Sequence, residues 1–172
     1  AMLKVKREDF VPLELKEESY MDTPLHIPGG ATISALHMHA ISLEALKLKP
    51  GDRFLEVGAG SGIVQAYTSE IIGKKGKVIG IEISEETYEF GKKNLEKSGY
   101  NDVNFVFGDG SIGLPKEAPF DKILISAACP DIPKPLIEQL KYGGTIIAVV
   151  GSAYGEQQLV SLEKTKEGKL IR

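Results

Sequence analysis

A glycine-rich turn between two strand-like runs constrains the fold of this chain more than any other feature. The apolar run from Phe54 to Val57 leads into the glycine turn from Gly58 to Gly62, and a helix-like segment follows as far as Ile72. A second apolar run begins at Lys77 and ends at Glu82. Alternate glycines let the backbone turn sharply after a strand and let a ligand approach the helix start with no Cβ in the way. These features predict a βαβ unit that binds a nucleoside cofactor.

The spacing within this unit favours one cofactor over others. Glu82 ends the second strand, where a carboxylate can accept the hydrogens of both ribose hydroxyls. A dinucleotide fingerprint has the spacing G-x-G-x-x-G, but Ile63 stands where its third glycine would fall. The departure disfavours a nicotinamide oxidoreductase. It favours S-adenosyl-L-methionine, which has adenosine and an amino acid but no phosphate.

The rest of the chain continues the alternation of strands and helices. Ser84 is expected to begin a helix, and Asp109 follows a third strand, at the sheet edge where open α/β sheets bind ligands. Strands are predicted at 53–57, 77–82, 103–107, 122–126, 145–150 and 157–164, with a return strand from 169 and a helix over 133–141. This order predicts an α/β fold of Rossmann-like, doubly wound type, with a mostly parallel sheet and helices on both faces.

Length and composition indicate one domain, 1–172, with an N-terminal cap segment, 1–50, that serves the substrate and a Rossmann-like core, 51–172. A net charge of −3 provides no general attraction to nucleic acid or to an anionic membrane, so neither is an expected partner. No apolar run is long enough to span a bilayer. The single cysteine, Cys129, excludes an internal disulfide framework and suits a reducing cytoplasm. A cytoplasmic monomer is expected.

The segment that precedes the glycine turn contains a second candidate region. A helix is predicted to begin after Ser34, whose side chain would be the N-cap, with Ile33 and Met38 at the positions of a hydrophobic staple. His37 and His39 invite a metal reading, which we reject because helical residues two apart point to different faces and no third ligand is suitably spaced. Ser34 and His39 are thus polar residues near a helix start, with no metal expected.

Six separate motifs, in the same order, resemble the protein-L-isoaspartate (D-aspartate) O-methyltransferase family of class I S-adenosylmethionine-dependent enzymes. They cover nearly the whole chain: Arg7 to Pro12, Ala31 to His39, Leu55 to Gly62, Gly108 to Gly110, Ala118 to Asp121, and Ile132 to Gly144. The resemblance implies a class I methyltransferase fold. It also implies methyl transfer from S-adenosyl-L-methionine, with S-adenosyl-L-homocysteine as product, to the carboxylate of L-isoaspartyl and D-aspartyl residues. Damaged proteins and peptides would be the substrates, and methylation would begin their repair.

The resemblance also implies roles for particular residues. Ser34 matches the family's active-site serine. The residues expected to bind cofactor or to lie beside it are Ala31, Thr32, Ile33, His39, Glu56, Gly58, Gly60, Glu82, Asp109 and Gly110. Glu82 would hold the ribose hydroxyls, Asp109 the adenine amino group, and Glu56 would face the methionine end or bond the loop amides.

Two departures and two short ends leave alternative functions open. Gly30 stands where the family usually has glutamine, and Leu36 where eukaryotic-like members have proline. The family normally has a helix before Ala1 and a further strand pair after Arg172, so the chain is expected to be shortened at both ends. The alternatives are a class I methyltransferase acting on RNA or a small molecule, and a catalytically impaired S-adenosylmethionine-binding protein.

Overall fold

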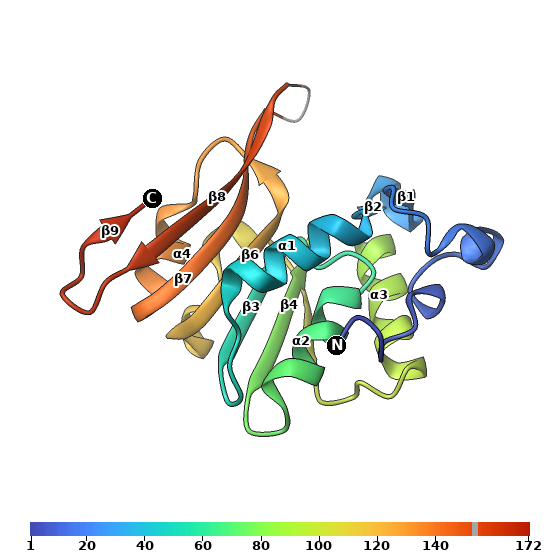
Figure 1. Ribbon diagram of the computed structural model, residues 1–172, viewed down its shortest axis with the longest axis horizontal. Coiled ribbons are helices and arrows are strands. Elements are labelled where there is room, and N and C mark those ends of the chain that lie inside the picture. The colour runs from blue at the N-terminus through green and yellow to red at the C-terminus, as the bar shows by residue number, and fades with distance from the viewer. Residues whose placement is uncertain (153–154) are drawn as a thin grey trace.

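The computed structural model describes residues 1–152 and 155–172, and its central feature is a seven-stranded sheet (Figure 1). The strands are β3 (Arg53–Val57), β4 (Lys77–Glu82), β5 (Asn104–Phe107), β6 (Phe120–Cys129), β7 (Leu140–Gly151), β8 (Gln157–Lys164) and β9 (Leu170–Ile171). Their order across the sheet is β5-β4-β3-β6-β7-β8-β9. The first five are mutually parallel, whereas β8 and β9 pair antiparallel at one end. The mostly parallel sheet predicted from the alternation of elements is confirmed.

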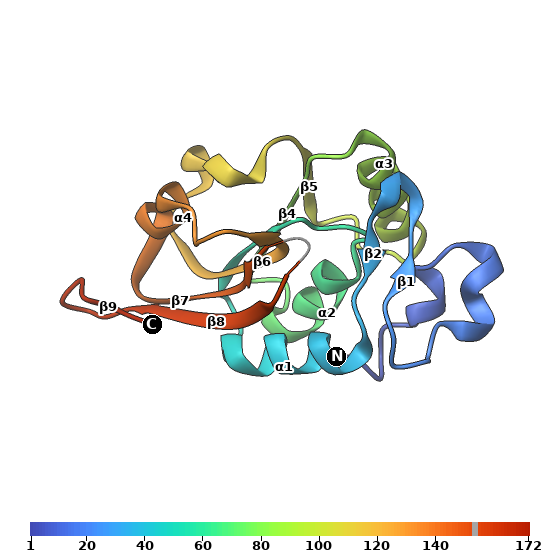
Figure 2. The same cartoon turned by 90° about the horizontal axis from the view of Figure 1, so that it is seen from above.

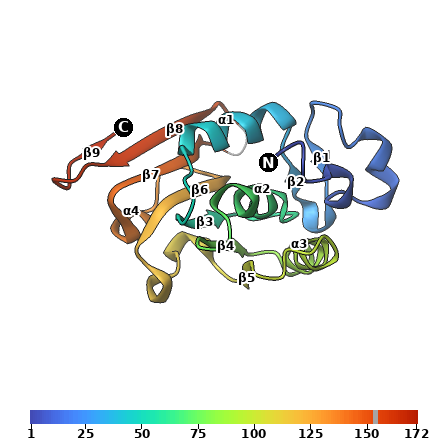
Figure 3. The ribbon, with the colours of Figure 1, turned by 60° about the horizontal axis from the view of Figure 1, so that its bottom comes forward.

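Helices cover both faces of this sheet. They are α1 (Leu36–Leu46), α2 (Ile63–Ile72), α3 (Glu85–Lys97) and α4 (Lys134–Gln139). Figures 2 and 3 show α1 and α2 on one face of the sheet and α4 on the other, while α3 lies towards the β5 edge. None of the described helices is both long and apolar enough to cross a membrane.

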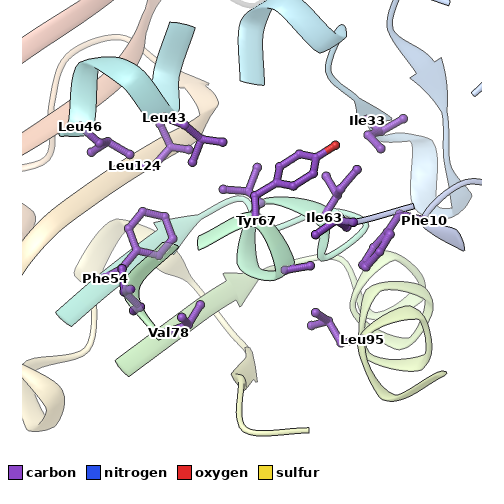
Figure 4. Close-up of a cluster of buried hydrophobic side chains, with 14 of the residues drawn as sticks. Phe10, Ile33, Leu43, Leu46, Phe54, Ile63, Tyr67, Val78, Leu95 and Leu124 are labelled. Atoms are coloured by element: carbon purple, nitrogen blue, oxygen red, sulfur yellow. The ribbon is translucent and has the colours of Figure 1, made fainter. Parts of the chain in front are cut away.

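Alternation along each strand divides the buried side chains into two cores. In β3, Phe54 packs with α1 and α2, whereas its neighbour Leu55 packs in the second core with Leu136 of α4. Figure 4 shows the first core, where Leu43 and Tyr67 from these two helices meet the strand residues. Each Å² of apolar surface removed from water stabilises the fold by roughly 25 cal/mol, so the two cores hold the sheet rigid from both sides. The strand ends are thereby fixed in space.

The order of the strands places a ligand crevice at β3 and β6. The chain runs from β3 to β4 and β5 in one direction, then returns to β6 on the other side of β3. Such a reversal separates the loops at the carboxyl ends of the two central strands. The glycine turn after β3 lies at this point, as the βαβ prediction requires.

The helix start predicted at Ser34 is wrong. Ala35 occupies the N-cap position, and no side chain of the capping residue bonds the helix. The preceding residues form β2 (Thr32–Ile33), which pairs antiparallel with β1 (Leu25–His26), so the backbone stays extended longer than expected. The carboxylate of Asp22 accepts a hydrogen bond from the N–H of His37 at 3.0 Å. A residue distant in sequence thus bonds one of the N–H groups that have no partner within the first turn of the helix.

Candidate active site

A cavity of about 450 Å³ opens at the carboxyl ends of β3, β4 and β6, and it collects the residues named from the sequence. All eleven line it: Ala31, Thr32, Ile33, Ser34, His39, Glu56, Gly58, Gly60, Glu82, Asp109 and Gly110. They come from the N-terminal segment, the glycine turn and the ends of three strands. Its volume lies within the range of roughly 300–1,000 Å³ that is usual for small-molecule sites.

The glycine turn has a backbone that other residues would strain. Gly58, Gly60 and Gly62 have φ angles of +79°, +55° and +86°. A Cβ on Gly58 would lie 2.8 Å from the Cβ of Ala127, so the turn packs directly against the end of β6. Nothing lies so close to Gly60, where a Cβ would meet its nearest atom, on Ile27, at 3.7 Å. The first glycine is needed for packing between strands, and the second for its conformation.

Glu82 is buried at the end of β4 and stabilises the glycine turn. Its Oε2 accepts a hydrogen bond from the N–H of Gly60 at 2.9 Å, and its Oε1 accepts from the N–H groups of Ile83 and Ser84 at 2.9 and 3.0 Å. A carboxylate has about four acceptor positions. Three are filled by backbone groups, which leaves about one for a ligand hydroxyl.

Glu56 lines the cavity. Of the two roles expected for it, facing the methionine end or bonding the loop amides, the structure contradicts the second. It accepts hydrogen bonds from the side chains of Gln65 and Ser126, while Glu82 takes the loop amides. Burial raises the pKa of Glu56 to about 8, although the bonds from Ser126 and Gln65 act in the opposite direction. At neutral pH this carboxyl group therefore holds its proton most of the time.

Asp109 lies exposed at the rim of the cavity, after β5. Its Oδ1 accepts the N–H of Ser111 at 2.8 Å, and this bond holds the pKa of Asp109 below its usual value. This contact uses Oδ1, so Oδ2 remains available as an acceptor.

Ser34 and His39 line the same cavity, and a buried cation, Arg7, contacts both residues from outside it. Ser34 lines the cavity, and its hydroxyl bonds no group among residues 1–152 and 155–172. The guanidinium of Arg7 donates to the Ser34 carbonyl at 2.8 Å and lies 3.3 Å from Nδ1 of His39. Arg7 is fully buried, and His39 is nearly so.

The two departures occupy positions of different kinds: Gly30 has a left-handed backbone that favours glycine over the family's usual glutamine, and Leu36 begins a helix. Gly30 has a φ of +75°, and a Cβ there would meet nothing within 4 Å. Leu36 is the first residue of α1, a position that accepts proline and other residues alike.

Sequence reasoning missed further polar residues of the cavity wall, among them Ser126 and Ser111. Ser126 ends the strand predicted over 122–126, so the argument that placed Asp109 at a strand end applied to it as well. Arg7 and Gln65, which contact wall residues from outside the cavity, were also missed in the sequence. No local pattern connects Arg7 with Ser34 or Gln65 with Glu56.

The residues of this cavity suit S-adenosyl-L-methionine. The glycine turn offers an approach free of Cβ atoms, Glu82 and Asp109 offer acceptors for hydroxyl and amino hydrogens, and Ile83 offers an exposed apolar side chain beside them. The carboxylate of Glu82 gives the wall an acidic group that suits a cationic ligand, and no lysine or arginine that could bind a phosphate lies among the described wall residues.

Comparison with known proteins agrees with this geometry. The family model described as Protein-L-isoaspartate(D-aspartate) O-methyltransferase (PCMT) matches residues 1–172. Protein-L-isoaspartate O-methyltransferase 2 of Archaeoglobus fulgidus is 51% identical over 170 residues, which cover 99% of this chain and 77% of that protein. The Methanococcus aeolicus protein-L-isoaspartate O-methyltransferase is 49% identical over 172 residues and is covered to 78% of its length.

Solved structures give the same result. A Plasmodium falciparum protein, described as a beta-aspartate methyltransferase (PCMT) in complex with S-adenosyl-L-homocysteine, superposes with a TM-score of 0.86 at 30% identity, covering 99% of this chain and 82% of that one. A second structure, a protein-L-isoaspartate O-methyltransferase, has a TM-score of 0.85 at 32% identity and is covered to 53% of its length. The chain belongs to the protein-L-isoaspartate(D-aspartate) O-methyltransferase family.

Proposed function

We propose that this chain transfers the methyl group of S-adenosyl-L-methionine to the carboxylate of L-isoaspartyl and D-aspartyl residues in damaged proteins, so beginning their repair. The family acts on isoaspartyl proteins. One observation supports the proposal most: residues from four of the motifs matched to the family, together with Glu82, line a single cavity at the switch point of the sheet. The product leaves as S-adenosyl-L-homocysteine.

The cofactor side of the cavity is assigned to the glycine turn and the two strand-end carboxylates. Glu82 would accept from a ribose hydroxyl at the acceptor position that its three backbone bonds leave. Asp109 would accept from the adenine amino group through Oδ2, and Gly58, Gly60 and Gly110 would let the ligand lie close to the backbone.

The chemistry requires little acid–base help from the protein. When bound, S-adenosyl-L-methionine supplies an electrophilic methyl group on a sulfonium centre. The accepting carboxylate is already ionised at pH 7, because model carboxyl pKa values are about 4. Ser34, whose hydroxyl is free of partners in the described chain, would donate a hydrogen bond that aims this carboxylate. Orientation of this kind can contribute up to roughly 7–11 kcal/mol.

The N-terminal segment, residues 1–50, is proposed as the substrate side of a single domain. Ala31 to Ser34 form part of the cavity wall, and α1 lies along β6 and β7. We further propose a cytoplasmic monomer with no nucleic-acid or membrane partner. The net charge of −3 supports the absence of these partners, and the lone Cys129 suits a reducing compartment. Size-exclusion chromatography with light scattering tests the monomer.

The decisive experiment offers the chain two peptides that differ in one residue, isoaspartate or aspartate, with labelled S-adenosyl-L-methionine. Labelling of the isoaspartyl peptide alone supports the proposed function. Labelling of neither peptide, with S-adenosyl-L-homocysteine still bound, would contradict it and favour an impaired binding protein. Labelling of both, or of RNA added in parallel, would indicate a methyltransferase of another specificity.

A further inference from the structure

Arg7 is a buried cation that forms no ion pair with any described residue. Its side chain is fully buried, yet no carboxylate of the described residues lies within the 4.0 Å of an ion pair. Its Nε has no hydrogen-bond partner in the part of the chain that the structure describes. Burying a charge in this way is costly unless its groups are bonded. The contacts that it does make are therefore informative, and two of them lead to the wall of the cavity.

One contact determines which nitrogen of His39 carries the hydrogen. A guanidinium has five donors and no acceptor, so Nδ1 of His39, 3.3 Å from Nη1 of Arg7, must be the acceptor of that bond. In a neutral imidazole the hydrogen then resides on Nε2. Burial, and then the charge of Arg7, lower the pKa of His39 to about 3, so the ring is neutral in this form at physiological pH.

The Nε2–H of His39 is left as a donor at the cavity. His39 lines the main cavity, and together with Ser34 it also lines a smaller adjoining cavity of about 30 Å³. Nε2 bonds no described residue, and it is not one of the unbonded polar atoms that are completely enclosed by protein. Ser34 and His39 thus present two neutral donors on one wall, with the charge of Arg7 behind them, whereas Glu56 and Glu82 lie elsewhere on the wall.

A carboxylate is the ligand group that two donors and a nearby cation recognise. We propose that Arg7 is a positioning residue: it holds Nδ1 of His39 as an acceptor, so that Nε2–H donates a hydrogen bond to a carboxylate of a bound ligand. This inference rests on the proposed function, which provides two ligands with such a group. They are the amino-acid end of the cofactor and the isoaspartyl residue.

The tautomer is tested first, in the wild-type chain. Nitrogen–proton correlation spectra of protein labelled with ¹⁵N-histidine distinguish the Nε2–H, Nδ1–H and doubly protonated forms. The chain has three histidines, so the His39→Gln variant identifies the signals of His39 by their loss. We expect the Nε2–H form at pH 7, and finding either other form would overturn the proposal.

Two variants of Arg7 then test the cause. Arg7→Lys retains a cationic donor and should retain the Nε2–H form of His39, whereas Arg7→Met should give a mixture of tautomers. An unchanged tautomer in a folded Arg7→Met chain would overturn the role of Arg7. Since removing a buried side chain can prevent folding, the wild-type spectra remain an independent test.

The last test identifies the carboxylate. His39→Ala removes a hydrogen bond to a charged group, so the affinity for the ligand that carries the carboxylate is expected to fall about tenfold or more. His39→Gln provides a donor again and should largely restore that affinity. Weaker binding of S-adenosyl-L-homocysteine, but not of its decarboxylated analogue, would assign the donor to the cofactor. An unchanged affinity with a raised KM for the isoaspartyl peptide would assign it to the acceptor. No change in either quantity would overturn the proposal.

The matched control is His37→Gln. His37 is exposed, pairs with Asp22 and does not line the cavity, so neither quantity should change. The binding and spectroscopic measurements do not depend on methyl transfer. If the wild-type chain methylates no isoaspartyl peptide, the proposed function fails while the role of Arg7 is still measured.

Discussion

The carboxylate of Glu82 accepts a hydrogen bond from the backbone N–H of Gly60 at 2.9 Å, joining the end of β4 to the turn that follows β3. Two residues 22 positions apart thereby hold the backbone that a cofactor would approach. The same carboxylate is the proposed ribose acceptor. Its structural and ligand-binding roles are coupled, which determines what its replacement should do.

Replacing Glu82 by glutamine should weaken the binding of S-adenosyl-L-homocysteine about tenfold or more. The amide offers a single acceptor oxygen, so at least one N–H that Glu82 now satisfies would lose its partner, at a cost of about 1–3 kcal/mol. Titration calorimetry measures the affinity. Glu85→Gln, an exposed neighbour in the first turn of α3, is the control and should bind normally. Normal binding of S-adenosyl-L-homocysteine by both variants would argue that Glu82 does not contact the cofactor.

Replacing Gly58 by alanine should destabilise the protein more than replacing Gly99 does. Both glycines have nearly the same φ, +79° and +82°, so both substitutions carry the left-handed strain of about 1–2 kcal/mol. A Cβ at Gly58 would also lie 2.8 Å from Ala127, whereas one at Gly99 would meet nothing within 4 Å. Urea unfolding of the two variants gives the difference. Equal losses would mean that β6 moves freely away from the turn.

The stability of the protein should depend on pH through Glu56. Its pKa is about 8 in the folded state against 4.5 ordinarily, so the folded protein binds more protons between these values. The contribution of Glu56 to stability is complete below pH 4.5 and is lost as the pH rises through 8, at about 1.4 kcal/mol for each pKa unit. Glu56→Gln cannot ionise and should lose less stability between pH 6 and 9, as measured by urea unfolding.

The control for this pH dependence is Glu89→Gln, which removes an exposed carboxylate of α3. Its stability curve should parallel that of the wild type. A Glu56→Gln curve that also parallels the wild type would show that Glu56 is ionised when the protein is folded.

Replacing Ser34 by alanine should reduce turnover about tenfold or more and leave stability within about 0.5 kcal/mol of the wild type. Ser34 is not the N-cap of α1, and its hydroxyl bonds no described residue, so nothing in the fold depends on it. Methyl transfer to the isoaspartyl peptide and thermal unfolding are the two measurements. Ser161→Ala, an exposed serine of β8, is the control. Unchanged turnover would remove Ser34 from the reaction.

The helix start that Ser34 does not cap should depend on Asp22. Asp22→Ala removes the acceptor for the N–H of His37 and should lower the melting temperature, although Asp22 lies outside the cavity. Circular dichroism during heating measures the shift. A melting temperature equal to that of the wild type would mean that water satisfies this N–H equally well.

The sequence by itself determined the alternation of strands and helices, the glycine turn and the strand-end carboxylates Glu82 and Asp109. These are local properties: periodicity sets the element type, glycine permits the positive φ, and a strand end predicts exposure to a ligand. The tertiary structure decided which groups meet. Only packing brought Ser126 onto Glu56, and the burial of Glu56, against the effect of this bond, raised its pKa. Arg7 reached Ser34 and His39 across about thirty residues of chain for the same reason, since a buried donor takes whichever acceptor the fold places beside it.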